Sequence, residues 1–323
     1  MRRRLDRLGD LSLPHYSQFV LAVVLLVAVD LAMQTGSRVE GPRRGAVSVL
    51  GFLPAGVLAD PVWPAVCRWT LAVAAVLWLL QLLVPLSSWL AVAAFTAAGA
   101  FYEENLDYVD HVHHLTHGVL FLHALWYHFY RREIRDALGR GAFWTTPLAP
   151  AWLPAGALFL VGTFYTWGGI TKLVYSGRAW ASGVPMQLWA HLWGREGYFL
   201  RDWIVGHRWI ARAGQISILT VETFAWLAWF DRRLRIAIGL VLVVGFHLVI
   251  EQMFGFLFHG NASGVALVLL PVREGVEGLI ARARAKAGPP RRVRLPGGVA
   301  GRLRRAVLAR TDLLGRFDLE VPG

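Results

Sequence analysis

The chain has 323 residues, and its 33 Lys and Arg outweigh its 21 Asp and Glu to give a net charge of +12. Counted with glycine and without tyrosine, its apolar share is about 64%, against about 45–50% in soluble domains. This excludes an ordinary cytosolic enzyme and the disordered, collagen-like and disulfide-scaffold classes, and the single Cys67 allows no internal disulfide. The composition, including 15 Trp suited to two water–lipid interfaces, predicts a polytopic membrane protein.

Eight mostly apolar segments approach the roughly 20 residues that a helix needs to cross a bilayer. In chain order they are 17–34, 67–85, 88–102, 113–130, 152–175, 213–230, 235–255 and 256–272. They predict an all-α bundle of about eight transmembrane helices over residues 17–272. The third segment is short and the last two are poorly separated, so seven or nine crossings are the alternatives.

Lys and Arg in short loops predict the orientation of such a bundle. They cluster at the N-terminus (1–16), after the fourth and sixth segments, and in the tail (273–323). Eight crossings place these four regions on one side, which predicts an integral protein of the plasma (inner) membrane with both termini cytoplasmic. The loop at 176–212 weakens the rule, because it carries five Arg on the opposite side, although it is long enough to escape the rule.

The tail carries twelve Lys and Arg against five acids, and Pro289-Pro290 and Pro296 break any long helix in it. We expect it to be attracted to anionic lipid headgroups. It contains no interleaved aromatic residues and no nucleic-acid module, so we expect no nucleic-acid partner.

Ionisable residues inside a bilayer cost several kcal/mol each and are functional candidates by default. The candidates are Asp30, the polar run at 103–117, Lys172, Glu222, His247, Glu251 and His259. In the eight-segment topology most of them, Glu222 excepted, lie toward the non-cytoplasmic side. Their positions predict one polar cavity that opens to that side.

The polar run contains Asp110, His113, His114 and His117, and on a helix Asp110, His114 and His117 share a face. One interpretation is a solvated hairpin tip, and the other is a base or a metal site, since imidazole is the commonest metal ligand. His113 and His117 fit one histidine box of a membrane di-iron enzyme, but the remaining histidines complete no set.

Lys172 lies near the end of the fifth segment, directly after Gly168, Gly169 and two further residues. The glycines allow close helix approach. The lysine either extends to the interface or is buried, which favours the neutral amine and makes it a usable base. His247 and Glu251 stand one turn apart as a structural or functional pair, and Glu222 is a candidate hydrogen-bond partner.

The run Gly168-Gly169-Ile170-Thr171-Lys172-Leu173, followed by Trp180 and Gly183, resembles a signature of the vitamin K-dependent gamma-carboxylase family. Its bacterial relatives are the HTTM (horizontally transferred transmembrane) domain proteins. Phe246-His247, Gln252, Phe254 and Pro271 are similar to a second stretch, and the histidines that open the fourth segment to a third. The resemblance covers about residues 15–272 and identifies a short form without the carboxylases' C-terminal domain.

The resemblance implies that Lys172 deprotonates vitamin K hydroquinone or another quinol, assisted by His113 or His114. It also implies that His247 belongs to the catalytic group. Trp180 and Glu222, together with Asp110, His117 and Glu251, are then expected near the substrate. Thr171 stands where the carboxylases have a second lysine, and Val112 where they have an asparagine, so carboxylation of a peptide is not expected to carry over.

Three functions remain open from the sequence. The first is a carboxylase-like enzyme that acts on a lipophilic substrate. The second is a non-enzymatic membrane protein that aids maturation, export or immunity of a small secreted peptide. The third is a histidine-ligated metal oxidoreductase. The sequence predicts neither the cofactor nor the oligomeric state.

Overall fold

The computed structural model describes residues 52–104 (without 55, 58, 59 and 81), 114–139, 152–254, 259–288, 291–294 and 317–320, with the single residues 150 and 308. The chain forms two compact units. The first unit holds α4 (Val62–Leu79), α5 (Leu86–Glu104), the second half of α6 (His114–Phe129), α7 (Arg131–Gly139), α16 (Val272–Ala287), β1 (Arg291–Arg294) and β2 (Phe317–Glu320).

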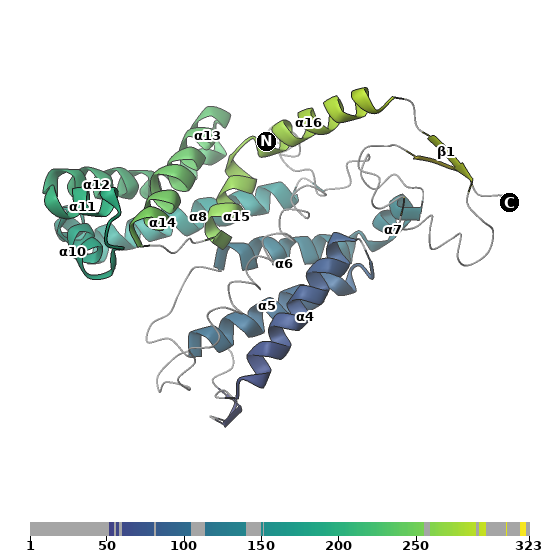
Figure 1. Ribbon diagram of the computed structural model, residues 1–323, viewed down its shortest axis with the longest axis horizontal. Helices are drawn as coiled ribbons and strands as arrows, with labels where there is room; N and C mark the ends of the chain where they lie inside the picture. Colours follow the sequence, from purple (N-terminus) through teal and green to yellow (C-terminus); the bar gives the residue numbers. More distant parts are fainter. Residues whose placement is uncertain are drawn as a thin grey trace. The chain divides into compact units, whose positions relative to one another are not determined.

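The second unit holds the first residues of α6 and the chain from 154 to 271. Its helices are α8 (Trp152–Tyr175), α9 (Gly177–Trp180), α10 (Val184–Trp193), α11 (Phe199–Gly206), α12 (Arg208–Thr223), η2 (Ala225–Trp229), α13 (Arg232–Leu240), η3 (Val241–Leu248), α14 (Val249–Phe254) and α15 (His259–Leu269). Figure 1 labels most of them.

In the first unit, α4 packs along α5 through buried alanines. Ala74 and Ala75 of α4 and Ala91 of α5 are fully buried, and such small side chains let helix backbones approach closely. Trp78 at the end of α4 meets His123 and Tyr127 of α6 edge-on, with ring centroids 6.1 and 6.2 Å away. This unit is therefore held by small residues along the helices and by large aromatic residues at their ends.

The described part of the tail consists of one helix and two short strands. Helix α16 ends at Ala287, just before Pro289-Pro290, as those prolines predict. Beyond it β1 pairs with β2 as parallel strands, in a register that places Arg292 opposite Asp318 and Arg294 opposite Glu320. The predicted helical fold is confirmed for most of the described residues. This pair of four-residue strands is the departure from it, because such short segments give no sequence pattern.

The second unit is organised by α8 and by the continuous helical run from Arg232 to Phe254. Helices α12 and η2, which lie between these two elements in the chain, run antiparallel to α8. A Cβ added to Gly169 of α8 would meet Thr223, whereas Phe159, nearer the start of α8, lies 6.3 Å from Trp229 (ring centroids). The backbone N–H of Trp226 donates to the Thr166 hydroxyl at 3.1 Å between these two contacts.

The helical run from Arg232 begins at an N-cap. The Asp231 carboxylate accepts hydrogen bonds from the backbone N–H groups of Leu234 and Arg233, at 3.0 and 2.8 Å. These bonds lower the pKa of the exposed Asp231 side chain. Since the pKa of Asp231 is depressed in the folded protein, the Asp231 N-cap stabilises the fold fully above the ordinary aspartate pKa of about 3.9. This stabilisation is lost as the pH falls through the folded pKa.

We therefore expect Asp231→Ala to lower the melting temperature of the purified protein at neutral pH, with the difference from wild type shrinking below about pH 4. Asp231→Asn keeps an oxygen acceptor and should lose less. Thermal unfolding followed by tryptophan fluorescence between neutral and acidic pH checks both variants. If Asp231→Ala lowers the melting temperature by the same amount at every pH, the Asp231 N-cap does not stabilise the fold through its carboxylate.

Two of the described helices are long and apolar enough to cross a bilayer, namely Trp152–Tyr175 and Arg232–Phe254, with 24 and 23 residues. The prediction of about eight such helices is wrong by this measure. The apolar parts of α4 and α5 end at Trp78 and Phe101 and are shorter than a span, and α12 carries charged and polar residues over its length. The predicted first segment, 17–34, lies outside the described residues.

The predicted loop at 176–212 is largely helical in the structure. Helices α10 and α11 pack against each other and against α12 and α14, and the short α9 packs against α10. Ala190, Ile204, Ala211 and Met253 form the buried centre of this group. We call residues 177–212 the cap, because they lie at the C-terminal end of α14 and follow directly on α8.

Candidate functional site

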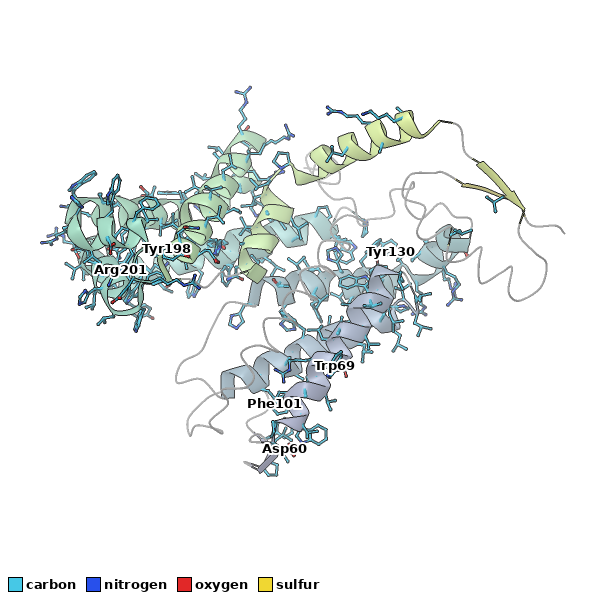
Figure 2. The ribbon with its side chains drawn as sticks, in the orientation of Figure 1. Asp60, Trp69, Phe101, Tyr130, Tyr198 and Arg201 are labelled. Carbon is cyan, nitrogen blue, oxygen red and sulfur yellow. The ribbon has the colours of Figure 1, made fainter. Side chains whose placement is uncertain are left out.

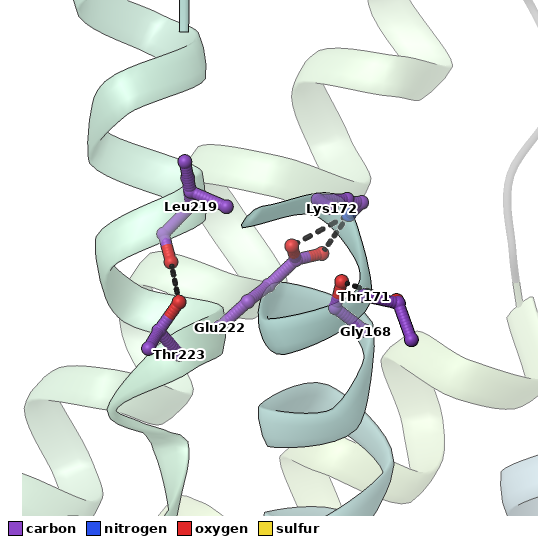
Figure 3. A network of polar contacts seen from close by, with 6 residues as sticks. All are labelled: Gly168, Thr171, Lys172, Leu219, Glu222 and Thr223. Carbon is purple, nitrogen blue, oxygen red and sulfur yellow. Dashed lines mark hydrogen bonds and ion pairs between the residues drawn. The ribbon is translucent and has the colours of Figure 1, made fainter. Parts of the chain in front are cut away.

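The Lys172 and Glu222 side chains form an ion pair between α8 and α12. The Lys172 ammonium lies 2.6 Å from Oε1 and 2.5 Å from Oε2 of Glu222, so it donates to both carboxylate oxygens (Figure 3). The Glu222 side chain is 4% exposed and that of Lys172 is 24% exposed. The pair is therefore shielded on the carboxylate side and keeps limited access on the amine side.

Gly169 is the residue that lets the two helices come close enough for this pair. A Cβ at position 169 would lie 2.5 Å from the backbone nitrogen of Thr223 and 2.8 Å from its Cα. Position 168 is open, with nothing within 4 Å of an added Cβ. Of the two glycines predicted to allow close helix approach, Gly169 is thus the one that does so.

Aromatic rings surround the amine of Lys172. Its Nζ lies 5.2 Å from the ring centroid of Trp180 in the cap and 6.0 Å from that of Phe246 in η3. Rings at this distance stabilise a cation through the negative face of their π-system. Trp180, a predicted substrate-side residue, therefore lies beside Lys172, and Phe246 joins it from a different helix.

Tyr165 and His247 form a second polar contact in the same unit. The Tyr165 hydroxyl and His247 Nε2 are 2.7 Å apart, and both residues are buried. Tyr165 is seven residues before Lys172 and hence on the same face of α8. The tautomer of the imidazole determines which group donates: a neutral ring with a free Nε2 accepts from the phenol, and a ring protonated at Nε2 donates to it.

Tyr165 is thus a described partner of His247, and the predicted pairing of His247 with Glu251 stays a prediction. Residues Val241–Leu248 form a π-helical turn, whose i→i+5 bonds widen the turn. His247 lies inside this wide turn and contacts Tyr165 of α8. Glu251 lies in α14 and is half-buried. Wide turns of this kind occur often at functional sites.

Gln215 is a polar residue of this region that the sequence pattern did not indicate. It is buried on the face of α12 that also carries Ile218, Leu219 and Glu222. In the described part of the chain, neither its amide nitrogen nor its amide oxygen has a hydrogen-bond partner. The same holds for the indole nitrogen of Trp180. The spacing of Gln215 and Glu222, seven residues apart, was the available signal.

The predicted histidine group is only partly described. His114 begins α6 and is exposed, and His117 is half-buried one turn later. Asp110 and His113 lie outside the described residues. Among the residues that the structure does describe, the side-chain ammonium of Lys172 donates only to Glu222. Among the same residues, no three His, Cys, Asp or Glu side chains come together as a metal-binding group.

Comparisons with known proteins give no match to a family model, to a curated protein or to a solved structure. The chemistry of the site therefore follows from its own residues. An amine and a carboxylate in contact, shielded from water and flanked by aromatic rings, can exchange a proton between themselves and with a third group.

Proposed function

We propose that this chain is a multi-pass membrane protein of the plasma (inner) membrane that removes a proton from a hydroxyl group of a lipophilic substrate, such as a quinol. Lys172 acts as the base and Glu222 as its proton partner. The observation that carries the proposal is the shielded Lys172–Glu222 contact with aromatic rings around the amine.

The outward faces of the two long helices support the membrane location. Only 28% of the most apolar stretch of Arg232–Phe254 is buried in the protein, and 50% of that of Trp152–Tyr175. Large apolar side chains such as Phe159, Trp167 and Val244 stand exposed on them. A core helix of a soluble protein would be covered, whereas lipid covers such faces at no cost. The cytoplasmic position of both termini stays a prediction.

The proton step needs only groups in this site. When the Lys172 proton passes to Glu222, the pair becomes a neutral amine beside a neutral carboxylic acid, which burial favours over two separate charges. The substrate O–H bond then breaks as an N–H bond forms on Lys172, which leaves a substrate oxyanion beside an ammonium ion. The ammonium stabilises the oxyanion. The proton transfer uses only the site and the substrate and needs no further reactant.

Two further features support a substrate with polar groups in this unit. The buried Gln215 amide, seven residues before Glu222, has a donor and an acceptor without partners in the described structure. Leaving such groups unpaired costs about 1–3 kcal/mol each, and a polar ligand group would remove this cost. The resemblance of the Lys172 segment to the gamma-carboxylases, which use a quinol, agrees with the same substrate class.

An alkylated 1-naphthol tests the proposal, because its ionised form has its own fluorescence. We expect wild-type protein in nanodiscs to ionise the bound naphthol at a lower pH than protein-free nanodiscs do. Lys172→Met should bind the probe with the ionisation midpoint of the lipid control. Lys172→Arg, which keeps a charge but cannot act as a neutral base, separates base action from simple charge attraction.

Ionisation that is the same in wild type and Lys172→Met would contradict a lysine-base enzyme. So would a wild-type protein that does not bind the probe. Either result would favour the non-enzymatic alternative, in which the ion pair only holds α8 against α12. Far-UV circular dichroism of each variant ensures that the comparison is between folded proteins.

A further inference from the structure

The helices of the cap are too short to cross a bilayer, since α9, α10 and α11 have 4, 10 and 8 residues. They are nevertheless fixed to a helix that is long enough. The backbone N–H of Arg195 donates to the Met253 carbonyl of α14 at 2.8 Å, and Met253 packs with Ala190 and Ile204 of the cap. The cap is thus held at the end of a candidate membrane span.

The outer face of α10 is apolar. Val184, Leu188 and Leu192 follow one another at intervals of four residues, which places them in one stripe. Leu188 and Leu192 leave more than half of their surface exposed, and Trp193 beside them does too. Helix α11 repeats the pattern, since Phe199 and Trp203 are exposed, one turn apart and in edge-on contact at 6.2 Å.

The same segment carries an excess of exposed arginines. Five arginines stand against two acids between residues 177 and 212. The exposed ones are Arg178, Arg195, Arg208 and Arg212. Arg201, labelled in Figure 2 near Tyr198, instead bonds to the carbonyl of Ala190 and to Asp202 inside the cap.

Arg208 and Arg212 lie one turn apart at the start of α12, so their charges repel each other unless an anion compensates them. Arg208 donates from Nε to the Ser182 carbonyl at 3.4 Å, which holds its guanidinium beside the α9–α10 turn. Exposed Trp, Phe and Leu next to Arg are typical of helices that lie in a membrane interface.

We propose that the cap lies in the headgroup layer of the bilayer, with its aromatic and leucine side chains toward the acyl chains. Its arginines, Arg208 and Arg212 foremost, bind the phosphates of anionic lipids. This proposal rests on the membrane location proposed above and goes beyond it, because it assigns a lipid class and a depth to a segment that cannot span. It also accounts for the arginine excess of 176–212, which the orientation rule leaves unexplained.

Spin labels are introduced into a Cys67→Ala variant in nanodiscs. They measure separately the depth of the cap and the depth of the long helix Arg232–Phe254. A label at Leu192→Cys should collide poorly with a water-soluble nickel complex, and it should move deeper when phosphatidylglycerol replaces part of the phosphatidylcholine. A label at Val244→Cys, on the exposed face of η3, should be the more accessible to oxygen and closed to nickel. Open nickel access at Val244 would overturn the membrane location itself.

A Leu192 label as open to nickel as the free label in buffer, with Val244 still closed, would overturn the cap proposal alone. The cap proposal would also be overturned if the depth of the Leu192 label did not change when phosphatidylglycerol is added. Substitution of the two arginines at the start of α12 supplies a controlled test of the lipid contact. Arg208→Gln with Arg212→Gln should abolish the lipid dependence, whereas Arg232→Gln with Arg233→Gln, at the other end of the long helix, should leave it intact. Equal effects of the two double variants would reject the assigned lipid contact.

Discussion

Replacing Glu222 alone with leucine is expected to destabilise the protein strongly, whereas replacing Lys172 and Glu222 together with apolar residues is expected to restore most of the loss. Glu222→Leu leaves the Lys172 ammonium without its partner in a largely shielded place. Removing one member of a buried ion pair typically costs about 3–5 kcal/mol, while replacing both with apolar residues of similar volume is often neutral. Thermal unfolding in detergent of wild type, Glu222→Leu and Lys172→Met/Glu222→Leu measures the difference.

Glu251→Leu is the matched control for this series. Glu251 lies one helix further along and is half-buried, so the same substitution there removes a carboxylate without breaking the Lys172 pair. We expect a much smaller change. If Glu251→Leu is as harmful as Glu222→Leu, the ion pair is not the source of the effect.

The double variant also separates structure from chemistry. A folded Lys172→Met/Glu222→Leu protein that no longer ionises the bound naphthol is the expected result of a proton-transfer site. A folded double variant that still ionises the probe would show that the pair is a structural link between α8 and α12 and nothing more.

Gly169→Ala is expected to have the second largest effect. The added methyl group would lie 2.5 Å from the Thr223 backbone nitrogen and 2.7 Å from its hydroxyl oxygen. Backbone atoms cannot turn away as a flexible side chain can, so α8 and α12 must separate. Overpacking of this kind costs about 1–3 kcal/mol, and the separation should also lengthen the Lys172–Glu222 contact, so naphthol ionisation should weaken together with stability.

Gly168→Ala makes the same chemical change one residue earlier, where nothing lies within 4 Å of the new methyl group. Because alanine favours a helix over glycine by about 0.5–1 kcal/mol, this variant should be as stable as wild type or slightly more stable. Equal melting temperatures for Gly168→Ala and Gly169→Ala would mean that the close approach at Thr223 does not limit the packing.

Some of the fold follows directly from local pattern. The fifth predicted segment, 152–175, coincides with α8, and the seventh, 235–255, agrees with Arg232–Phe254 within a few residues. Both are long apolar runs bounded by polar residues, a signal that needs no tertiary information. The cap was predicted as a loop, because helices of ten residues or fewer, interrupted by glycine and arginine, produce no such run.

The candidate site was predictable residue by residue but not as pairs. Lys172, Glu222 and His247 each stand out, because an ionisable group in an apolar segment is costly wherever it is found. Tyr165 gave no such signal, and its contact with His247 joins α8 to the wide turn at Val241–Leu248, a distant part of the chain. Helical spacing within one segment therefore could not predict that Tyr165 is a partner of His247.

The amino-acid sequence by itself determined that this is a strongly apolar, basic, mainly helical chain with a lysine near the end of a long apolar helix, since composition and periodicity depend only on neighbouring residues. The tertiary structure alone decided that the lysine contacts Glu222, fifty residues away in the chain. It also decided that Tyr165 contacts His247, which is eighty-two residues away. Those contacts depend on how closely two helix backbones approach. At Gly169 that distance is set by the absence of one methyl group opposite Thr223.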